Sequence, residues 1–331
     1  MEKLKVGVIG VGHLGKLHTK MFNLIENCEL IGVYDSDSEK SIAVAEEFKT
    51  KSYFSIEDLL KETNAVSIAA TTVAHYELAM KAFDFDNHVF IEKPITATIE
   101  QAEKLVELSE QKNLNLQVGH IERFNPGLLA IESYIKDPKF IQSDRLAPFN
   151  PRGTDVAVVL DLMIHDIDII LSLIKSQVVD VVANGVEVVS DNIDIANARI
   201  QFENGAVANV TASRISQKRM RKMRIFQKDN YLSLDFNTGA SEIYNLIPLD
   251  QDVPPAAMTI GEIGIGEKKK RLVYEQPEKI EVNALQYEIQ LFVNSILEKK
   301  SPVVSGKDGL RALKVADLIM QKINQSKGKL L

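Results

Sequence analysis

Gly10-Val-Gly12-His-Leu-Gly15 connects an apolar, β-branched run from Leu4 to Ile9 with a segment of helical spacing. The pattern G-x-G-x-x-G between a strand and a helix is typical of a dinucleotide-binding turn. Its first glycine permits the tight turn, its second lets the backbone approach a pyrophosphate, and its third allows close packing of the helix on the strand. Free N–H groups at the start of the helix, at His13 and Leu14, then face the anion.

Asp35 ends the second predicted strand, Leu30 to Tyr34, and lies 25 residues beyond Gly10 (35 − 10 = 25). A carboxylate at this place can accept hydrogen bonds from the ribose hydroxyls of NAD, and it would repel the 2′-phosphate of NADP. The sequence therefore favours NAD, while Ser36 and Lys40 leave NADP as the alternative cofactor. The competing interpretation is a plain βα turn followed by a loop aspartate.

Strands and helices alternate over the first 120 residues or so. Two helix starts carry capping boxes, Ser55-Ile-Glu-Asp58 and Thr98-Ile-Glu-Gln101. Near-continuous apolar strands that alternate with helices indicate a buried parallel sheet covered on both faces, which is a doubly wound α/β domain. Three further strands are predicted at residues 65–69, 89–91 and 114–118.

The pattern changes after Asn125-Pro126, which is typical of a helix N-cap followed by proline at the first helical position. We therefore predict a first domain over residues 1–122 and a second over 123–331. Glu203-Asn-Gly205 and Lys228-Asp-Asn230 suit hairpin turns, so the second domain is predicted as α+β with a large open, mainly antiparallel sheet. Its expected strands are 178–189, 196–202, 206–215, 221–227 and 231–236, and its expected helices lie near 156–174, 284–299 and 307–325.

Residues 252–271 contain Pro254-Pro255, three glycines and Lys268-Lys-Lys-Arg271. This composition predicts a long loop.

Composition excludes several classes of protein. The 331 residues are 45% hydrophobic and 26% charged, which is typical of a folded globular chain of two domains. The formal net charge of −7 has the wrong sign for a protein held on nucleic acid. Cys28 is the only cysteine, so no intrachain disulfide forms, and a cytoplasmic location is expected. The sequence has no apolar run of about 20 residues, so no membrane partner is expected.

Chemistry-bearing residues follow the later strands of the predicted parallel sheet. Ligands bind beyond the carboxyl ends of such strands, so these positions are candidates for cofactor and substrate contacts. Lys93 stands where a strand stops at a proline, and its ammonium would project toward the nicotinamide. A solvated strand end is the alternative. The three sets are Thr71-Thr72 with His75, Glu92-Lys93-Pro94, and Gly119-His120.

Asp161, His165 and Asp168 fall within about 60° of one another on an α-helix, so they share one narrow face. The rest of this segment is almost entirely Val, Leu, Ile and Met, which indicates a buried helix whose polar groups need partners. Three hypotheses remain open: a structural polar network, a metal site, and an acid/base pair that faces a substrate. No further ligand cluster supports the metal site, so none is expected.

The run Lys218-Arg-Met-Arg-Lys-Met-Arg224 would alternate its side chains between two faces if it formed a strand. Three interpretations compete. The run could be a solvated or edge-protecting group of charges, it could contact a substrate diphosphate or a neighbouring subunit, or it could bind nucleic acid. The net charge disfavours the last of these.

Together these residues resemble the glucose-fructose oxidoreductase, inositol dehydrogenase and rhizopine catabolism (Gfo/Idh/MocA) family of NAD(P)-dependent enzymes. The resemblance spans the chain, through the three glycines, Glu92-Lys93-Pro94, the spacing of Asp161 and His165, and Ser301-Pro-Val-Val-Ser-Gly306. It implies a Rossmann domain followed by a substrate domain whose open sheet forms the interface of a homodimer or homotetramer. The chain departs from the common pattern at Met163 and Val158-Val159, where glycine is usual.

The resemblance also implies residue roles. Lys93 and His165 become the catalytic candidates, with either one as the base, and Asp161 holds the substrate or orients the imidazole. The expected cofactor contacts are Gly10, Gly12, His13, Leu14, Gly15, Asp35, Ser36, Thr71, Thr72, His75, Glu92 and Lys93. The expected substrate contacts are His120, Arg123, Asn125, Asp161 and His165.

The expected activity is hydride transfer between a secondary hydroxyl of a sugar and the nicotinamide. Residues 118–126 and 155–168 are most similar to the branch that oxidises the 3-hydroxyl of UDP-N-acetylhexosamines. The alternatives are a dehydrogenase of a free polyol or simple sugar, and a dinucleotide-binding regulator without turnover.

Overall fold

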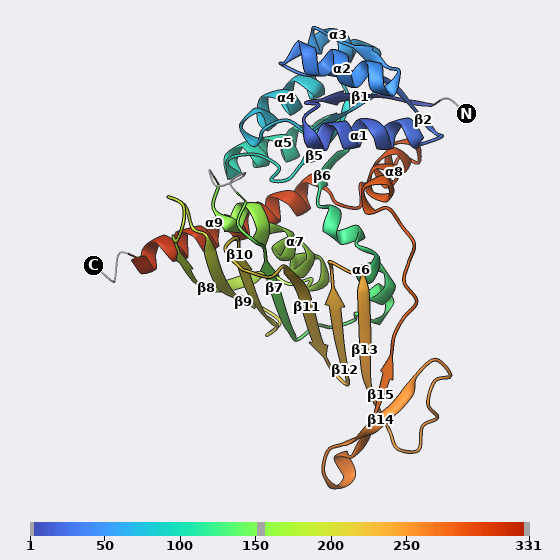
Figure 1. Ribbon diagram of the computed structural model, residues 1–331, viewed down its shortest axis with the longest axis vertical. Coiled ribbons are helices and arrows are strands. Elements are labelled where there is room, and N and C mark those ends of the chain that lie inside the picture. Colours follow the sequence, from blue (N-terminus) through green and yellow to red (C-terminus); the bar gives the residue numbers. More distant parts are fainter. Residues whose placement is uncertain (1–2, 151–155, 328–331) are drawn as a thin grey trace. The chain divides into compact units, whose positions relative to one another are not determined.

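A parallel sheet organises the first of two units in this computed structural model, which describes residues 3–150 and 156–327 (Figure 1). In the described chain this sheet has six strands in the order β3-β2-β1-β4-β5-β6, with every neighbouring pair parallel. That order is the doubly wound arrangement that binds dinucleotides, so the predicted fold class is confirmed. The strands are β1 (Leu4–Ile9), β2 (Cys28–Tyr34), β3 (Lys51–Ser52), β4 (Ala65–Ile68), β5 (His88–Glu92) and β6 (Leu116–Gly119).

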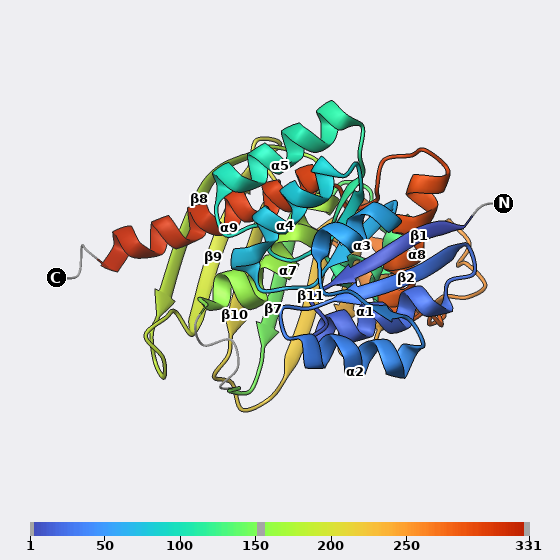
Figure 2. The same ribbon diagram turned by 90° about the horizontal axis from the view of Figure 1, so that it is seen from above.

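Helices cover both faces of this sheet (Figure 2). Val6 and Val8 pack with Phe22 of α1 on one face, while Gly7 between them meets Leu59 of α3 on the other. The predicted helix starts are confirmed, since Ser55 accepts a hydrogen bond from Asp58 N and Thr98 from Gln101 N. The helices are α1 (His13–Leu24), α2 (Ser38–Phe48), α3 (Ile56–Glu62), α4 (Thr72–Asp84) and α5 (Ile99–Lys112).

Helix α8 (Ala284–Leu297) packs in the core of the first unit, not in that of the second. Its Ile289, Phe292 and Val293 are fully buried against the same cluster as Leu4 and Val6. The first unit therefore comprises Met1–Ile121 and Asn283–Lys314, and the second comprises Glu122–Val282 and Val315–Leu331. A continuous second domain over 123–331 is corrected accordingly. Helical spacing shows that a helix has an apolar face, but not which core receives it.

The second unit is built on a mixed sheet that has nine strands in the described residues, ordered β14-β15-β13-β12-β11-β7-β10-β9-β8. All neighbours are antiparallel except β7 and β10. The predicted mainly antiparallel sheet is confirmed. Its strands are β7 (Phe140–Leu146), β8 (Val178–Val186), β9 (Ile195–Phe202), β10 (Val207–Ser213), β11 (Met220–Gln227), β12 (Asn230–Asp235), β13 (Ala240–Ile247), β14 (Met258–Ile263) and β15 (Lys270–Glu275).

The prediction of a long loop over 252–271 is wrong, because β14 and the start of β15 lie in it and pair as a hairpin. The side chains of β14 are exposed on both faces apart from Gly261, which is half-buried. Neither face of β14 is therefore buried, so the strand lacks the half-buried pattern by which a strand is recognised in a sequence.

In the described residues, the helices of this unit pack on one face of the nine-stranded sheet. Gly127 of α6 packs on Leu234 of β12, and Ile323 of α9 packs on Gly185 of β8. The opposite face carries a row of aromatic rings across neighbouring strands, from Phe226 through Tyr231 and Tyr244 to Tyr274, with centroids 4.7–5.2 Å apart. The helices are α6 (Pro126–Ile131), α7 (Ile164–Leu173) and the part of α9 (Gly306–Lys327) from Val315 on, and short 3₁₀ turns cover Ile121–Phe124, Glu132–Tyr134 and Gly266–Lys268.

A π-helix, Val159–Met163, precedes α7, where the sequence predicted one α-helix from about 156 to 174. A π-helix has more residues per turn than an α-helix, so the angular spacing assumed for Asp161 does not apply there. No helix in the described ranges is both long and apolar enough to cross a membrane.

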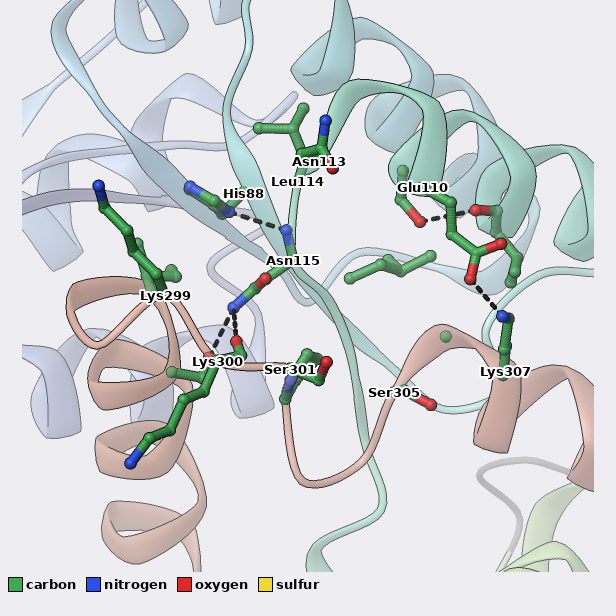
Figure 3. Close-up of a pocket in the computed structure, with 17 residues that line it drawn as sticks. His88, Glu110, Asn113, Leu114, Asn115, Lys299, Lys300, Ser301, Ser305 and Lys307 are labelled. Carbon is green, nitrogen blue, oxygen red and sulfur yellow. Dashed lines mark hydrogen bonds and ion pairs between the residues drawn. The ribbon is translucent and has the colours of Figure 1, made fainter.

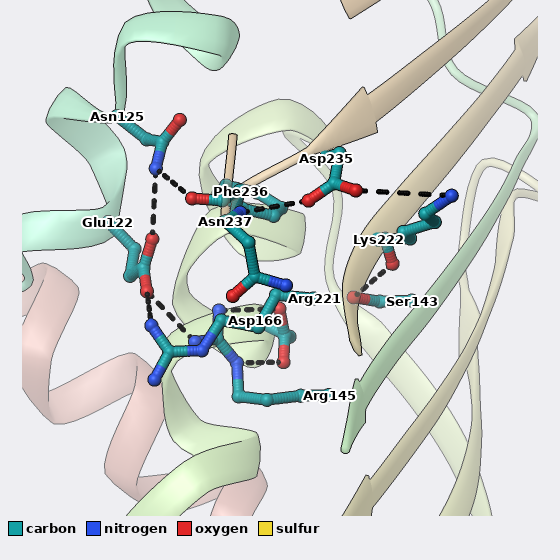
Figure 4. A network of polar contacts seen from close by, with 10 residues as sticks. All are labelled: Glu122, Asn125, Ser143, Arg145, Asp166, Arg221, Lys222, Asp235, Phe236 and Asn237. Atoms are coloured by element: carbon teal, nitrogen blue, oxygen red, sulfur yellow. Dashed lines mark hydrogen bonds and ion pairs between the residues drawn. The ribbon is translucent and has the colours of Figure 1, made fainter. Parts of the chain in front are cut away.

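Buried ion pairs fix α7 on the sheet (Figure 4). Arg145 of β7 is 2% exposed and donates to both carboxylate oxygens of Asp166, at 2.7 and 3.0 Å, and to Glu122 Oε1 at 2.9 Å. Burial lowers the pKa of Arg145, but the two carboxylates outweigh this and raise it above its usual value. The guanidinium therefore stays charged, and α7 is tied to the middle of the sheet.

Replacing Arg145 with Met should destabilise the second unit by about 3–5 kcal/mol, because it leaves the buried Asp166 carboxylate without its cation. The midpoint of urea unfolding measures the effect. Lys139→Met is the matched control: Lys139 flanks the same strand and pairs with Asp137, but both side chains are more than half exposed. The control should change stability by less than about 0.5 kcal/mol. Equal effects of the two substitutions would contradict the role given to the buried pair.

Candidate active site

The glycine-rich turn has the geometry that a pyrophosphate site requires. Gly10 has φ of +83°, which favours glycine, and its N–H donates to Tyr34 O at 2.8 Å. A Cβ on Gly15 would lie 1.7 Å from Gly10 O, so only glycine lets α1 approach the turn. A Cβ on Gly12 would meet nothing within 4 Å, so its backbone faces open space at the start of α1. His13 and Leu14 are exposed beside it, so the turn fits a dinucleotide.

Asp35 holds this turn as well as standing at the place expected for the ribose. Its Oδ2 accepts from Val11 N at 2.7 Å, and its Oδ1 accepts from Asp37 N at 2.9 Å. Each carboxylate oxygen accepts more than one hydrogen bond, so this clamp leaves capacity for ribose hydroxyls. The clamp on the glycine-rich turn was not predicted from sequence. Ser36 is exposed next to it.

His75 is 1% exposed, and both of its ring nitrogens face backbone carbonyls: Nδ1 that of Pro94 at 3.0 Å and Nε2 that of Ala70 at 3.1 Å. Burial lowers the pKa of this imidazole. We interpret His75 as a support for the chain after β4 and β5 rather than as a cofactor contact. Thr71 is exposed and Thr72 half-buried where α4 begins.

Glu92 and Lys93 stand at the carboxyl end of β5, where the sequence placed them. Glu92 Oε1 accepts from His18 Nε2 at 3.0 Å, and Glu92 Oε2 accepts from Lys93 N at 3.2 Å. Burial raises the pKa of Glu92, but the His18 hydrogen bond and the nearby positive charges lower it below its usual value. His18 was not among the predicted site residues. Its position three residues after Gly15, on the buried face of α1, is the signal that could have revealed it.

Asp161 and His165 are both half-buried. Asp168 is different: it is 1% exposed and forms a bidentate ion pair with Arg123, at 2.6 Å on each side. Asp168 therefore fits the structural polar network, one of the three hypotheses for this face, and not an acid/base group that faces a substrate. In the described residues no group of three or more His, Cys, Asp or Glu side chains is placed to hold a metal ion.

Two expected substrate contacts also support the fold. Asn125 caps α6 by accepting from Gly127 N at 3.1 Å, and its amide donates to Phe236 O at 3.1 Å. Arg123 is engaged with Asp168, and His120, which ends the first unit with Ile121, is 1% exposed. These residues lie near the point in the sequence where the first unit ends and the second begins. The sequence did not reveal their structural partners.

A cavity of about 850 Å³ lies in the first unit at the amino ends of β5 and β6, not at the carboxyl ends where ligands bind (Figure 3). Several of its polar groups are engaged with one another: His88 Nδ1 accepts from Asn115 N at 2.8 Å, and the Asn115 amide donates to Ser295 Oγ and Lys300 O. Lys307 pairs with Glu110 across its rim. We therefore assign the cofactor to the glycine-rich turn and not to this cavity.

Comparison with known proteins decides the family. The model of the oxidoreductase family with an NAD-binding Rossmann fold (GFO_IDH_MocA) matches residues 4–120, and that of the GFO/IDH/MocA C-terminal domain matches residues 134–232. The chain belongs to the Gfo/Idh/MocA family. It is thus an oxidoreductase with NAD as cofactor, as the sequence predicted.

The chain is similar to proteins named as nucleotide-sugar and inositol dehydrogenases. The chain is 36% identical to UDP-N-acetylglucosamine 3-dehydrogenase of Acidithiobacillus ferrooxidans, over 96% of each chain. A solved structure of that enzyme covers 98% of each chain at 34% identity and a TM-score of 0.86. Myo-inositol 2-dehydrogenase of Thermotoga maritima is 22% identical, over 94% of this chain and 93% of that one. Scyllo-inositol dehydrogenase from Lactobacillus casei, solved with NAD(H) and scyllo-inositol, shares the fold at a TM-score of 0.76 and 22% identity, over 98% of each chain.

The substitutions Gly12→Ala and Gly15→Ala should separate an effect on NAD binding from an effect on the stability of the fold. Gly12→Ala adds a methyl group in open space, so the thermal midpoint should stay near that of the wild type while the Kd for NAD rises about 10-fold or more. Gly15→Ala drives a Cβ into Gly10 O and should lower the thermal midpoint sharply. Calorimetry and NAD titration check both. A wild-type Kd in Gly12→Ala would contradict the placement of the pyrophosphate.

Proposed function

We propose that this protein is an NAD-dependent dehydrogenase that oxidises the 3-hydroxyl of the N-acetylhexosamine in a UDP-sugar. The observation that carries the proposal is the 36% identity to UDP-N-acetylglucosamine 3-dehydrogenase over 96% of both chains. Inositol dehydrogenases match at 22% identity, or at up to 30% over about half of the chain. A free polyol or simple sugar is therefore the second candidate substrate.

The proposed cofactor site consists of the glycine-rich turn, which holds the pyrophosphate, and Asp35, which accepts from the ribose. NAD supplies the hydride acceptor when bound. Its other contacts come from Thr71, Thr72, Glu92 and Lys93 at the carboxyl ends of β4 and β5. Because Asp35 presents a negative charge to the 2′-position, NAD should bind more tightly than NADP.

We assign the proposed acid/base roles by the chemistry of each side chain. An imidazole accepts a proton near neutral pH, so His165 takes the proton of the substrate hydroxyl as the hydride leaves its carbon. A lysine ammonium is a donor at this pH, so Lys93 binds the hydroxyl oxygen and orients it. Asp161 orients the imidazole or a sugar hydroxyl. The products are the 3-oxo sugar, NADH and one proton.

The basic run at residues 218–224 does not protect a sheet edge, because β11 pairs on both sides. Arg221 faces the helices and donates to Glu122 Oε1 at 3.2 Å, while Lys222 and Arg224 face the open side. Burial and the neighbouring charge of Arg145 lower the pKa of Arg221. A half-exposed guanidinium beside the network of α7 supports a role for Arg221 in binding the substrate diphosphate.

The open face of the nine-stranded sheet is the proposed interface of a homodimer or homotetramer in the cytoplasm. Exposed Val179, Val182 and Val186 of β8 and Phe226 of β11 lie among its residues, and apolar side chains in such number favour association. Light scattering should give the mass of two or four chains. A single-chain mass would contradict this interface.

Lys93→Met and His165→Asn should each lower kcat by about 100-fold or more, since general acid–base groups contribute about 10²–10⁴ to rate. The Kd for NAD should change little in His165→Asn. The assay follows NADH absorbance with UDP-N-acetylhexosamines, free hexoses and inositols, and it includes a 2-oxo acid in case tightly held NADH needs recycling.

His88→Gln is the control, because it changes a partly buried histidine at the other end of β5 and should retain wild-type kcat. Near-normal turnover in both test variants would refute the assigned site. Turnover of inositols alone would favour the second candidate substrate.

A further inference from the structure

His18 is a fully buried imidazole with a partner on each ring nitrogen. Nδ1 lies 2.8 Å from Ser67 Oγ on β4, and Nε2 lies 3.0 Å from Glu92 Oε1 at the end of β5. Its ring also meets Phe90 of β5 edge-on, at 5.3 Å between centroids. A carboxylate only accepts hydrogen bonds, so Nε2 donates to Glu92. In the neutral ring, Nδ1 then accepts from the hydroxyl of Ser67.

Glu92 connects His18 with the backbone of the next residue, Lys93. One carboxylate oxygen is held by His18, and the other accepts from Lys93 N at 3.2 Å. The carboxylate thus bridges a side chain of α1 and the backbone of Lys93. Both contacts lie within the first unit and at the carboxyl edge of its sheet.

The neighbouring strand is shaped to leave room for this carboxylate. A Cβ on Gly119, at the end of β6, would lie 2.9 Å from Glu92 Oε1. Glu92 therefore sits in a close-fitting slot between the buried face of α1 and the end of β6. A side chain held by shape and by two hydrogen bonds has little freedom to shift.

We infer that His18 is a positioning residue which, through Glu92, fixes the backbone of Lys93 relative to the helix of the glycine-rich turn. Gly15 and His18 lie three residues apart on the buried face of α1, so one helix sets both the pyrophosphate turn and the place of Lys93. The inference rests on the role proposed for Lys93 in turnover. Displacements near 1 Å at a reacting group cost about 100-fold in rate, so such a restraint has a measurable effect.

The merely structural alternative is that His18 fills space and satisfies two polar groups. It predicts lower stability on substitution, but no specific change at Lys93. Two readouts separate the hypotheses: the exchange rate of the Lys93 backbone amide with deuterated water, and the division of any kinetic loss between kcat and KM for NAD.

His18→Asn keeps a polar group near Ser67 but is too short to reach Glu92, whereas His18→Gln places an amide donor near the former Nε2. We expect Lys93 amide exchange to rise about 10-fold in His18→Asn, and kcat to fall about 10- to 100-fold with KM for NAD nearly unchanged. His18→Gln should restore most of both values. His88→Gln, a histidine substitution in the same unit, should change neither.

A double-variant cycle tests the route through Glu92. If His18 acts through that carboxylate, adding His18→Asn to Glu92→Gln should cost little more than Glu92→Gln alone. Wild-type Lys93 exchange in His18→Asn, equal losses in the Asn and Gln variants, or fully additive losses in the cycle would each overturn the inference.

The exchange measurement needs no substrate, so it stands apart from the proposed function. If the wild type turns over no sugar while His18→Asn still frees the Lys93 amide, the proposed function fails and the positioning of Lys93 is supported. If the wild type is active and His18→Asn has normal exchange, only the positioning inference fails.

Discussion

The contact between Gly15 and the carbonyl of Gly10 is the constraint on which the first unit depends. Only a residue without a Cβ allows α1 to approach the turn this closely, because the nearest atom would be 1.7 Å from a methyl carbon. This approach directs the N–H groups of α1 at the turn and brings His18 to the ends of β4 and β5. One steric requirement therefore links the cofactor turn with the strand end that carries Lys93.

In the second unit, ion pairs rather than a steric requirement hold the helix that carries His165 in place. Asp166 and Asp168 follow His165 on α7, and each is held by an arginine fork, from Arg145 and Arg123 respectively. Two such pairs on one short helix resist both rotation and sliding. His165 therefore stands on a helix whose orientation is set by these ion pairs.

Much of the fold could be predicted from sequence because glycines and helix caps mark the strand–helix junctions so clearly. Strand β1 and the caps at Ser55, Thr98 and Asn125 lie where the sequence placed them. The sequence could not show that α8 packs in the core of the first unit, because an apolar helical face does not indicate which core it packs against. It also did not reveal β14, which has no buried face, or the ion pair of Asp168, whose partner lies 45 residues away in the chain.

Isotope transfer from the substrate measures whether this chain oxidises the 3-hydroxyl of a UDP-N-acetylhexosamine. The protein is incubated with NAD and UDP-N-acetylglucosamine that carries deuterium at C3 of the sugar, and the NADH formed is analysed by mass spectrometry. The account predicts deuterium in the NADH and a 3-oxo sugar as the co-product. NADH without deuterium, or none formed with this sugar while an inositol is oxidised, would contradict it.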